Sequence, residues 1–150
     1  MASKITNTIL LDSVTKQIDL NGADDIRVAL VMTNTTVDTE VDKATNGDYT
    51  DVDEFDGANY TAGGKTLASE AAAIDVANVR VEFDFEDLTW TALGNGTRAI
   101  QGILIYKFVT NFNSSIPIAF VEFAVNQNPG GSDFTVKPGA EGVIHIKQAA

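Results

Sequence analysis

Two long stretches of this chain are apolar on both faces of an extended backbone, and they restrict its possible folds more than any other feature. Residues 98–109 carry apolar side chains at both odd and even positions, and residues 116–125 repeat the pattern. A strand with two apolar faces belongs in the middle of a sheet or between two layers. Pro117 lies near the start of the second stretch, where its missing N–H is tolerated. The two stretches predict a layered β protein with buried central strands.

Shorter segments predict further strands around these two. Residues 79–85 alternate between apolar and charged side chains, with Val79, Val81, Phe83 and Phe85 on one face. This period of two is typical of a half-buried strand. A tight hairpin is expected at residues 94–96, Gly-Asn-Gly, because this sequence supplies the positive φ angles that such turns need. The other expected strands are residues 5–11, 14–20, 26–32, 88–90, 134–136 and 142–147.

Two segments are less regular. Residues 36–48 are polar and predict one short helix, with Thr36 as its cap and Glu40 in its first turn. Residues 67–78 are alanine-rich and fit a helix or a strand, but their continuation into residues 79–85 favours one long strand. The expected fold is all-β: a single domain over residues 1–150, forming an antiparallel sandwich or barrel, jelly-roll-like, with at most one or two short helices.

The charge of the chain limits its partners. The net charge is −11, and residues 1–75 carry 14 acidic and 5 basic side chains, against 7 and 5 in residues 76–150. Nucleic acid and anionic membranes would repel such a chain, so neither is expected as a partner. No apolar run approaches the ~20 residues that span a bilayer, and the first residues lack the pattern of a signal peptide. We therefore expect a soluble protein that is made in the cytoplasm.

The residues that usually carry catalysis are scarce. Cysteine is absent, which excludes disulfides, thiolate nucleophiles and thiolate metal sites. The single histidine, His145, shares a strand face with Lys147, and we interpret it as a surface position. No serine lies in a Gly-x-Ser-x-Gly motif, and residues 63–66, Gly-Gly-Lys-Thr, lack the first glycine of a phosphate-binding loop. We expect neither an enzyme nor a bound cofactor.

Eight acidic residues between positions 38 and 56 form the one segment with possible metal chemistry. Calcium takes six to eight oxygen ligands. The weak calcium candidates are Asp48, Asp51, Asp53 and Asp56. The register of a calcium loop fails, because Phe55 and Ala62 occupy two of its ligand positions. A solvated acidic loop is the simpler interpretation, and a glycosidase with paired carboxylates stays open without positive evidence.

Two places are candidates for contact with a partner protein. Phe112 lies between Asn111 and Asn113 in a polar turn, and an aromatic side chain there can anchor a partner. The first eight residues are mostly polar and precede the first strong strand pattern. They predict an extended N-terminal arm, with Lys4 and Ile5 as contact residues.

Several segments together resemble a family of small structural proteins of tailed bacteriophages, the capsid decoration or cement proteins. The strongest are VRVEFD (79–84), LTW (88–90), GILIYK (102–107), SIPIAF (115–120), GGSDFTV (130–136) and EGVI (141–144). Residues 28–35 and 53–60 add to the pattern, so the resemblance runs from about Ile26 to the C-terminus. Lys137-Pro138 departs from the pattern and puts the pairing of the last two strands in doubt.

The resemblance implies a β-rich virion protein on the outside of a phage capsid. Such a protein binds the major capsid protein, is usually a homo-oligomer, and clamps neighbouring capsid subunits. It would be made in the host bacterial cytoplasm and would need no catalytic residue, metal or cofactor. Two alternatives stay open: a head–tail or tail component, and a calcium- or glycan-binding β-sandwich module.

Overall fold

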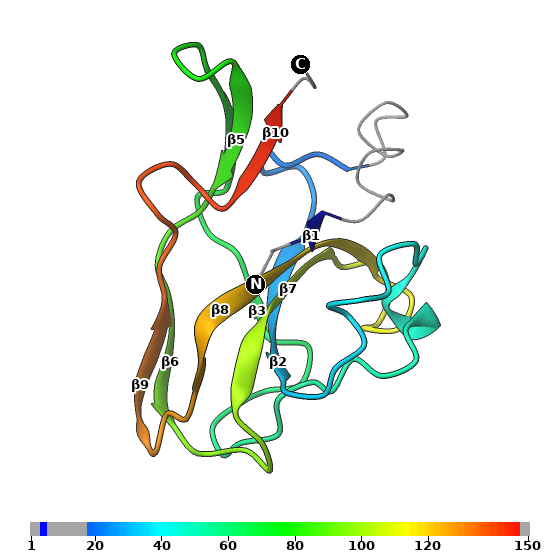
Figure 1. The fold of residues 1–150 in the computed structure, drawn as a ribbon, viewed down its shortest axis with the longest axis vertical. Coiled ribbons are helices and arrows are strands. Elements are labelled where there is room, and N and C mark those ends of the chain that lie inside the picture. Colours follow the sequence, from blue (N-terminus) through cyan, green and yellow to red (C-terminus); the bar gives the residue numbers. More distant parts are fainter. Residues whose placement is uncertain (1–3, 6–17, 148–150) are drawn as a thin grey trace.

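The computed structural model describes residues 4–5 and 18–147, and the regular secondary structure of this part is almost entirely strand (Figure 1). The strands are β1 (Lys4–Ile5), β2 (Ile26–Met32), β3 (Lys65–Thr66), β4 (Ala71–Asp75), β5 (Arg80–Asp84), β6 (Leu88–Leu93), β7 (Ile100–Lys107), β8 (Ile116–Gln127), β9 (Ser132–Val136) and β10 (Ile144–Lys147). In this part of the chain the 3-10 helix η1 (Asn46–Asp48) is the single helical element. All strand pairs are antiparallel. The predicted all-β antiparallel fold is confirmed.

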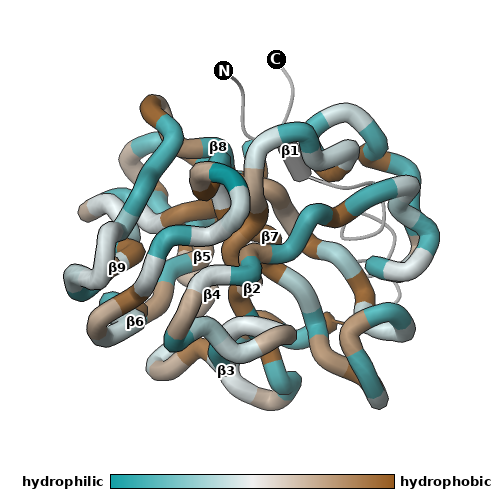
Figure 2. Tube along the Cα trace, turned by 90° about the horizontal axis from the view of Figure 1, so that it is seen from below, coloured by the Kyte–Doolittle hydropathy of each residue, from teal (hydrophilic) through white to brown (hydrophobic). Residues whose placement is uncertain are grey.

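The first layer is a five-stranded sheet in the order β1-β8-β7-β2-β3. Its central strands are buried on both faces, as predicted. On β2, Val28 and Leu30 point into one apolar core, whereas Ala29 and Val31 point into another, and all four are fully buried. Apolar segments accordingly gather along β2 and β7 in the middle of the molecule (Figure 2).

The second layer is a long ribbon built from two stretches of chain, residues 80–93 and 132–147, each of which forms two consecutive strands. β5 leads into β6 and β9 leads into β10, with β5 pairing with β10 and β6 with β9. Val81 therefore faces Ile146 near one end of the ribbon, and Leu88 faces Val136 further along. β4 adds to the outer side of β5. This ribbon packs on the first layer through the larger apolar core, which gives the molecule its sandwich architecture (Figure 1).

Loops, not a third layer of strands, cover the other face of the first sheet. Val37 and Tyr49 pack there against Leu104 and Tyr106 of β7. Phe112 also packs against this second core, with its ring edge-on to that of Tyr106 at a centroid distance of 5.2 Å. The polar segments that connect the strands therefore bury one face of the first sheet.

The predicted hairpin at residues 94–96 is wrong. β6 pairs with β9, so the chain crosses from the second layer to the first after Leu93. A Cβ atom added to Gly96 would lie 2.6 Å from the ring of Phe55, and the side chain of Asn95 accepts a hydrogen bond from Gly130. Gly96 and Asn95 therefore allow close packing where the chain crosses between the two layers, and they do not form a tight turn.

The two irregular segments also differ from expectation. Thr36 begins a single turn, in which the N–H groups of Thr39 and Glu40 donate to its carbonyl, and the short helix lies instead at η1. Residues 71–75 form a strand, as favoured, but the chain reverses at residues 76–79, so β4 and β5 make a hairpin. The continuous strand is therefore wrong.

Other strand predictions are partly confirmed. β8 is buried as expected through Phe120, but Val125 is 70% exposed. β9 and β10 pair with different strands and not with each other, so the doubt about their pairing was justified. The strands expected at residues 5–11 and 14–20 lie mostly outside the described residues, and residues 18–20 are not in a strand.

Candidate partner-binding surfaces

β8 bulges away from β7 between Glu122 and Gln127. Gly102 of β7 faces Glu122, but Ile100 faces Gln127, so residues 123–126 have no ladder partner in β7. The neighbour on the other side, β1, reaches only Phe120 and Ala119. Within the described part of the chain, residues 123–126 are thus extended backbone without a partner strand.

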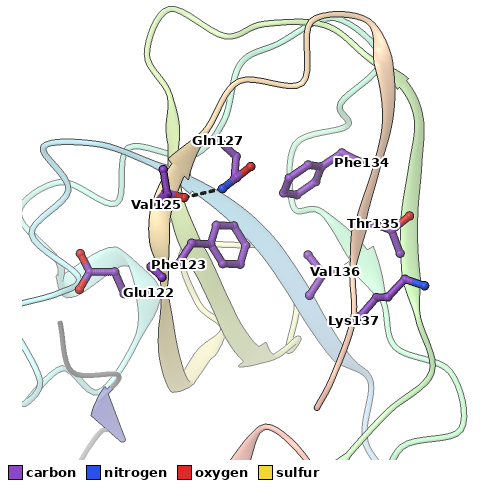
Figure 3. A pocket seen from close by; sticks show the side chains of 9 residues that line it. Glu122, Phe123, Val125, Gln127, Phe134, Thr135, Val136 and Lys137 are labelled. Carbon is purple, nitrogen blue, oxygen red and sulfur yellow. Dashed lines mark hydrogen bonds between the residues drawn. The ribbon is translucent and has the colours of Figure 1, made fainter. Parts of the chain in front are cut away.

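A groove of about 470 Å³ separates this half of β8 from β9 (Figure 3). Phe123 and Phe134 meet edge to face between the two strands, with ring centroids 6.0 Å apart. Val125 stands on the β8 side, and Lys137 lies at the end of the β9 side (Figure 3). Because β9 pairs only with β6 among the described strands, its edge towards the groove is open as well.

One backbone carbonyl of this open stretch is bonded by a nearby side chain. Nε2 of Gln127 donates to the carbonyl of Val125 at 2.5 Å, as the dashed line in Figure 3 marks. A side chain can exchange such a bond for one from an incoming N–H group, whereas a completed sheet ladder would have to open first. The groove therefore combines an apolar floor with backbone groups that another strand can reach.

A second apolar surface lies at the opposite end of the second layer, on the β4–β5 hairpin. Ile74 is 77% exposed and Val76 is 81% exposed. Val79 was predicted to face the core, but the structure places it in the turn with 72% exposure. The prediction for Val79 is wrong because the strand begins only at Arg80.

An ion-pair cluster supports the base of this hairpin. The guanidinium group of Arg80 is almost fully buried and contacts Asp75 at 3.0 Å, Glu82 at 2.5 Å and Glu141 at 3.1 Å. His145 lies opposite Glu82, with its Nδ1 atom 3.4 Å from Arg80. The histidine is half-buried at the edge of this charged cluster.

The structure places the weak calcium candidates apart, each with its own protein partner. Asp48 accepts hydrogen bonds from Thr45 at the start of η1, and Asp51 accepts the N–H of Asp53. Asp53 forms an ion pair with Arg98, and Asp56 accepts two hydrogen bonds from Thr97. Among the described residues, no three acidic, histidine or cysteine side chains group as a metal site would require.

Other acids of this region hold the loops in place. Glu40 accepts hydrogen bonds from the N–H and the hydroxyl of Thr50, and these lower the pKa of Glu40 to about 2. The hydroxyl of Thr36 donates to the same carboxylate at 3.0 Å. The acidic segment thus has an internal structural role in covering the first sheet.

The candidate contact residues are also engaged within the chain. Phe112 packs into the second core, so it is not the free anchor that its polar neighbours suggested. The backbone carbonyl of Asn113 accepts the N–H of Gly47, which joins the turn to η1. The backbone of Lys4 and Ile5 forms β1 at the edge of the first sheet, and the rest of the expected arm lies outside the described residues.

Comparison with known proteins gives no relative, since no family model, no curated protein and no solved structure matches this chain. The described part of the chain also contains no helix long and apolar enough to cross a membrane.

Sequence reasoning missed both apolar surfaces. The sequence predicts a buried strand at Phe123 and Val125, because nothing in it reveals where β8 bulges away from β7. A signal was present at the hairpin: Asn78 between Val76, Ala77 and Val79 is a turn residue inside an apolar segment. It indicates a reversal that carries apolar side chains into solvent.

Proposed function

We propose that this chain is a virion structural protein, which binds the outer surface of a phage capsid and stabilises contacts between capsid subunits. The observation that carries the proposal is the groove between β8 and β9, with two open strand edges above an apolar floor. The resemblance to capsid decoration proteins names the partner, the major capsid protein. The proposal assigns no catalytic step, metal or cofactor to the chain.

Strand addition suits attachment to a shell. An extended segment of a capsid subunit that enters the groove would receive backbone hydrogen bonds from residues 123–126 and apolar contacts from Phe123, Val125 and Phe134. Each such contact can be weak, because an array of identical sites raises the total strength of attachment. The acidic charge of the free protein keeps its copies apart before they attach.

The first test is the copy number of the chain in purified particles, measured by quantitative mass spectrometry against the most abundant shell protein. A ratio near one, or a simple fraction of it, supports a role across the whole shell. A few copies per particle would replace the proposal with a head–tail or tail component. Complete absence would overturn both and favour a calcium- or glycan-binding module.

The second test addresses the groove with shells that lack the protein. Val125→Asp places a charge on the groove wall, and we expect retention on shells to fall at least tenfold, that is by about 1.4 kcal/mol or more. Val109→Asp is the matched control, because Val109 is an exposed valine in a loop that does not line the groove. Equal retention of the two variants would exclude the groove as the contact.

A further inference from the structure

Three Asn-Gly pairs occur in the chain, and this is the dipeptide in which an asparagine side chain reacts most readily with its own backbone. The pairs begin at Asn21, Asn46 and Asn95. In this reaction, deamidation, the backbone nitrogen of the following residue attacks the side-chain carboxamide, and glycine hinders the attack least because it has no side chain. The reaction also needs an unbonded N–H group, room for the backbone to rotate, and access to water. The fold gives the three pairs different environments, and these decide which pair can react.

The first pair meets these requirements. Asn21 and Gly22 are both exposed, in the turn of residues 20–23 that precedes β2. The N–H group of Gly22 has no acceptor within the described part of the chain. Gly22 has a φ angle of 89°, and a Cβ atom added there would meet nothing within 4 Å among the described residues beyond its chain neighbours. The backbone at Gly22 can therefore rotate without losing an N–H bond or a packing contact.

Strand β4 adds a group that favours the reaction at Asn21. The backbone N–H of Ala72 donates to Oδ1 of Asn21 at 2.7 Å. Attack on the carboxamide carbon of Asn21 places negative charge on this oxygen, and an N–H group already directed at it stabilises that charge. The carboxamide of Asn21 is therefore activated as well as accessible.

The pair at Asn46 is protected by burial. Asn46 is 1% exposed, so water does not reach its carboxamide freely. The N–H group of Gly47 donates to the backbone carbonyl of Asn113 at 2.8 Å. The nitrogen that would attack is thus held in a hydrogen bond, which has to break before the reaction can start.

The pair at Asn95 is exposed but crowded at its glycine. Oδ1 of Asn95 accepts the N–H of Gly130 at 2.8 Å, which resembles the contact at Asn21. A Cβ atom added to Gly96, however, would lie 2.6 Å from the ring of Phe55 and 2.7 Å from the carboxylate of Asp56. This packing opposes rotation of the backbone, and the carboxylate opposes the negative charge that develops when the Gly96 nitrogen loses its proton.

We propose that Asn21 is a site of spontaneous deamidation in the folded chain. Hydroxide removes the proton of the Gly22 N–H group, and the nitrogen forms a bond to Cγ of Asn21. The bond from Cγ to Nδ2 breaks, Nδ2 takes up a proton from water and leaves as ammonia, and a cyclic imide remains.

Water then opens the ring of this imide at either of its two carbonyl groups. One product is aspartate, and the other is isoaspartate, whose main chain runs through the side-chain carbon. Nothing is oxidised or reduced in either step. Each event makes the net charge of −11 one unit more negative. This inference is independent of the proposed attachment to a capsid.

Peptide mapping by mass spectrometry tests the proposal on the full chain, incubated at mildly alkaline pH. We expect aspartate and isoaspartate to accumulate first at Asn21, and at Asn46 and Asn95 at least about tenfold more slowly. In urea, which removes the fold, the three pairs should react at similar rates. Reaction at Asn46 or Asn95 as fast as at Asn21 in the folded chain would overturn the proposal. So would an Asn21 that reacts in urea but not in the folded chain.

Two matched variants assign the ammonia that the folded chain releases. Asn21→Asp keeps an oxygen acceptor for the N–H of Ala72, so it should fold as the wild type does while losing most of the ammonia release. Asn95→Asp removes the other exposed pair and should release ammonia at the wild-type rate. Wild-type release from Asn21→Asp, or loss of release in Asn95→Asp, would show that the reactive pair lies elsewhere.

Discussion

At the scale of single residues, Glu54 is a carboxyl group inside a largely apolar environment. Burial raises the pKa of Glu54, and hydrogen bonds from the hydroxyl of Tyr60 and the N–H of Gly63 partly offset this rise. The hydroxyl of Tyr60 also accepts the backbone N–H of Leu30. Glu54 thereby fastens the loop around residues 54–63 to β2, which it meets at a bridge to Val31.

Replacing Glu54 by glutamine should change how stability depends on pH. Because the pKa of Glu54 is higher in the folded chain than its ordinary value of 4.5, the folded state binds more protons than the unfolded state above that pH. The wild type then loses stability as pH rises through the folded pKa. Glu54→Gln cannot ionise, so its melting temperature should rise relative to that of the wild type as the pH is increased above 4.5. An equal dependence of the melting temperature on pH in the wild type and in Glu54→Gln would contradict this prediction.

Glu40→Gln is the contrasting variant, and its effect should appear on the acid side. The pKa of Glu40 lies near 2 in the folded chain, below its ordinary value of 4.5. The stability that this carboxylate contributes is present above pH 4.5 and is lost as pH falls towards 2. The variant lacks this contribution at neutral pH and should show a flatter acid profile.

At the scale of elements, the two faces of β7 depend on different kinds of cover. Ile103 points to the second layer of strands, whereas Leu104 points to the loops that close the other core. Both side chains are at most 1% exposed. Loops that bury a leucine so completely are part of the fold.

Ile103→Ala and Leu104→Ala should therefore destabilise the protein to a similar degree. Deleting a buried aliphatic side chain costs about 2–5 kcal/mol, depending on how far the cavity collapses. Urea unfolding with a common probe measures both variants. A cost below about 1 kcal/mol for Leu104→Ala alone would show that the loops do not bury that face in solution.

The elements were easier to predict than their partners. Apolar runs and alternation located most described strands, because burial of a face leaves a direct imprint on the side-chain pattern. Pairing leaves little imprint: nothing local in residues 88–93 indicates that Trp90 lies opposite Phe134 and not in a hairpin with β7. The apolar surface at Val125 could not be predicted for the same reason. Its exposure depends on how β8 pairs with β7, and the local sequence does not show this pairing.

At the scale of the whole molecule, repulsion between the many acidic side chains destabilises the compact folded state. The net charge of −11 is concentrated in the first half of the chain, where the acidic loops pack over one sheet. Screening by salt reduces repulsion between exposed charges. The free energy of unfolding should therefore increase with ionic strength. Carboxylates that have a local hydrogen-bond or ion-pair partner should contribute less to this increase.

Raising NaCl from about 10 mM to about 200 mM should raise the melting temperature by a few degrees, since the Debye length shortens over this range. CaCl₂ at matched ionic strength should do no more than NaCl, because Asp48, Asp51, Asp53 and Asp56 have separate protein partners. A further increase that is specific to calcium would reveal a bound ion and revive the alternative of a calcium-binding module.

The doubled ribbon of the second layer has a consequence for biosynthesis. β5 and β6 leave the ribosome well before β9 and β10, the strands with which they pair. Until then the nascent chain can form the β4–β5 hairpin, but Phe83 and Trp90 lack the residues of β10 and β9 that lie opposite them in the folded protein. Such an intermediate invites wrong pairing with other nascent chains. Rapid translation after β7, or a chaperone that covers β5 and β6 until β9 and β10 emerge, would favour the yield of folded protein.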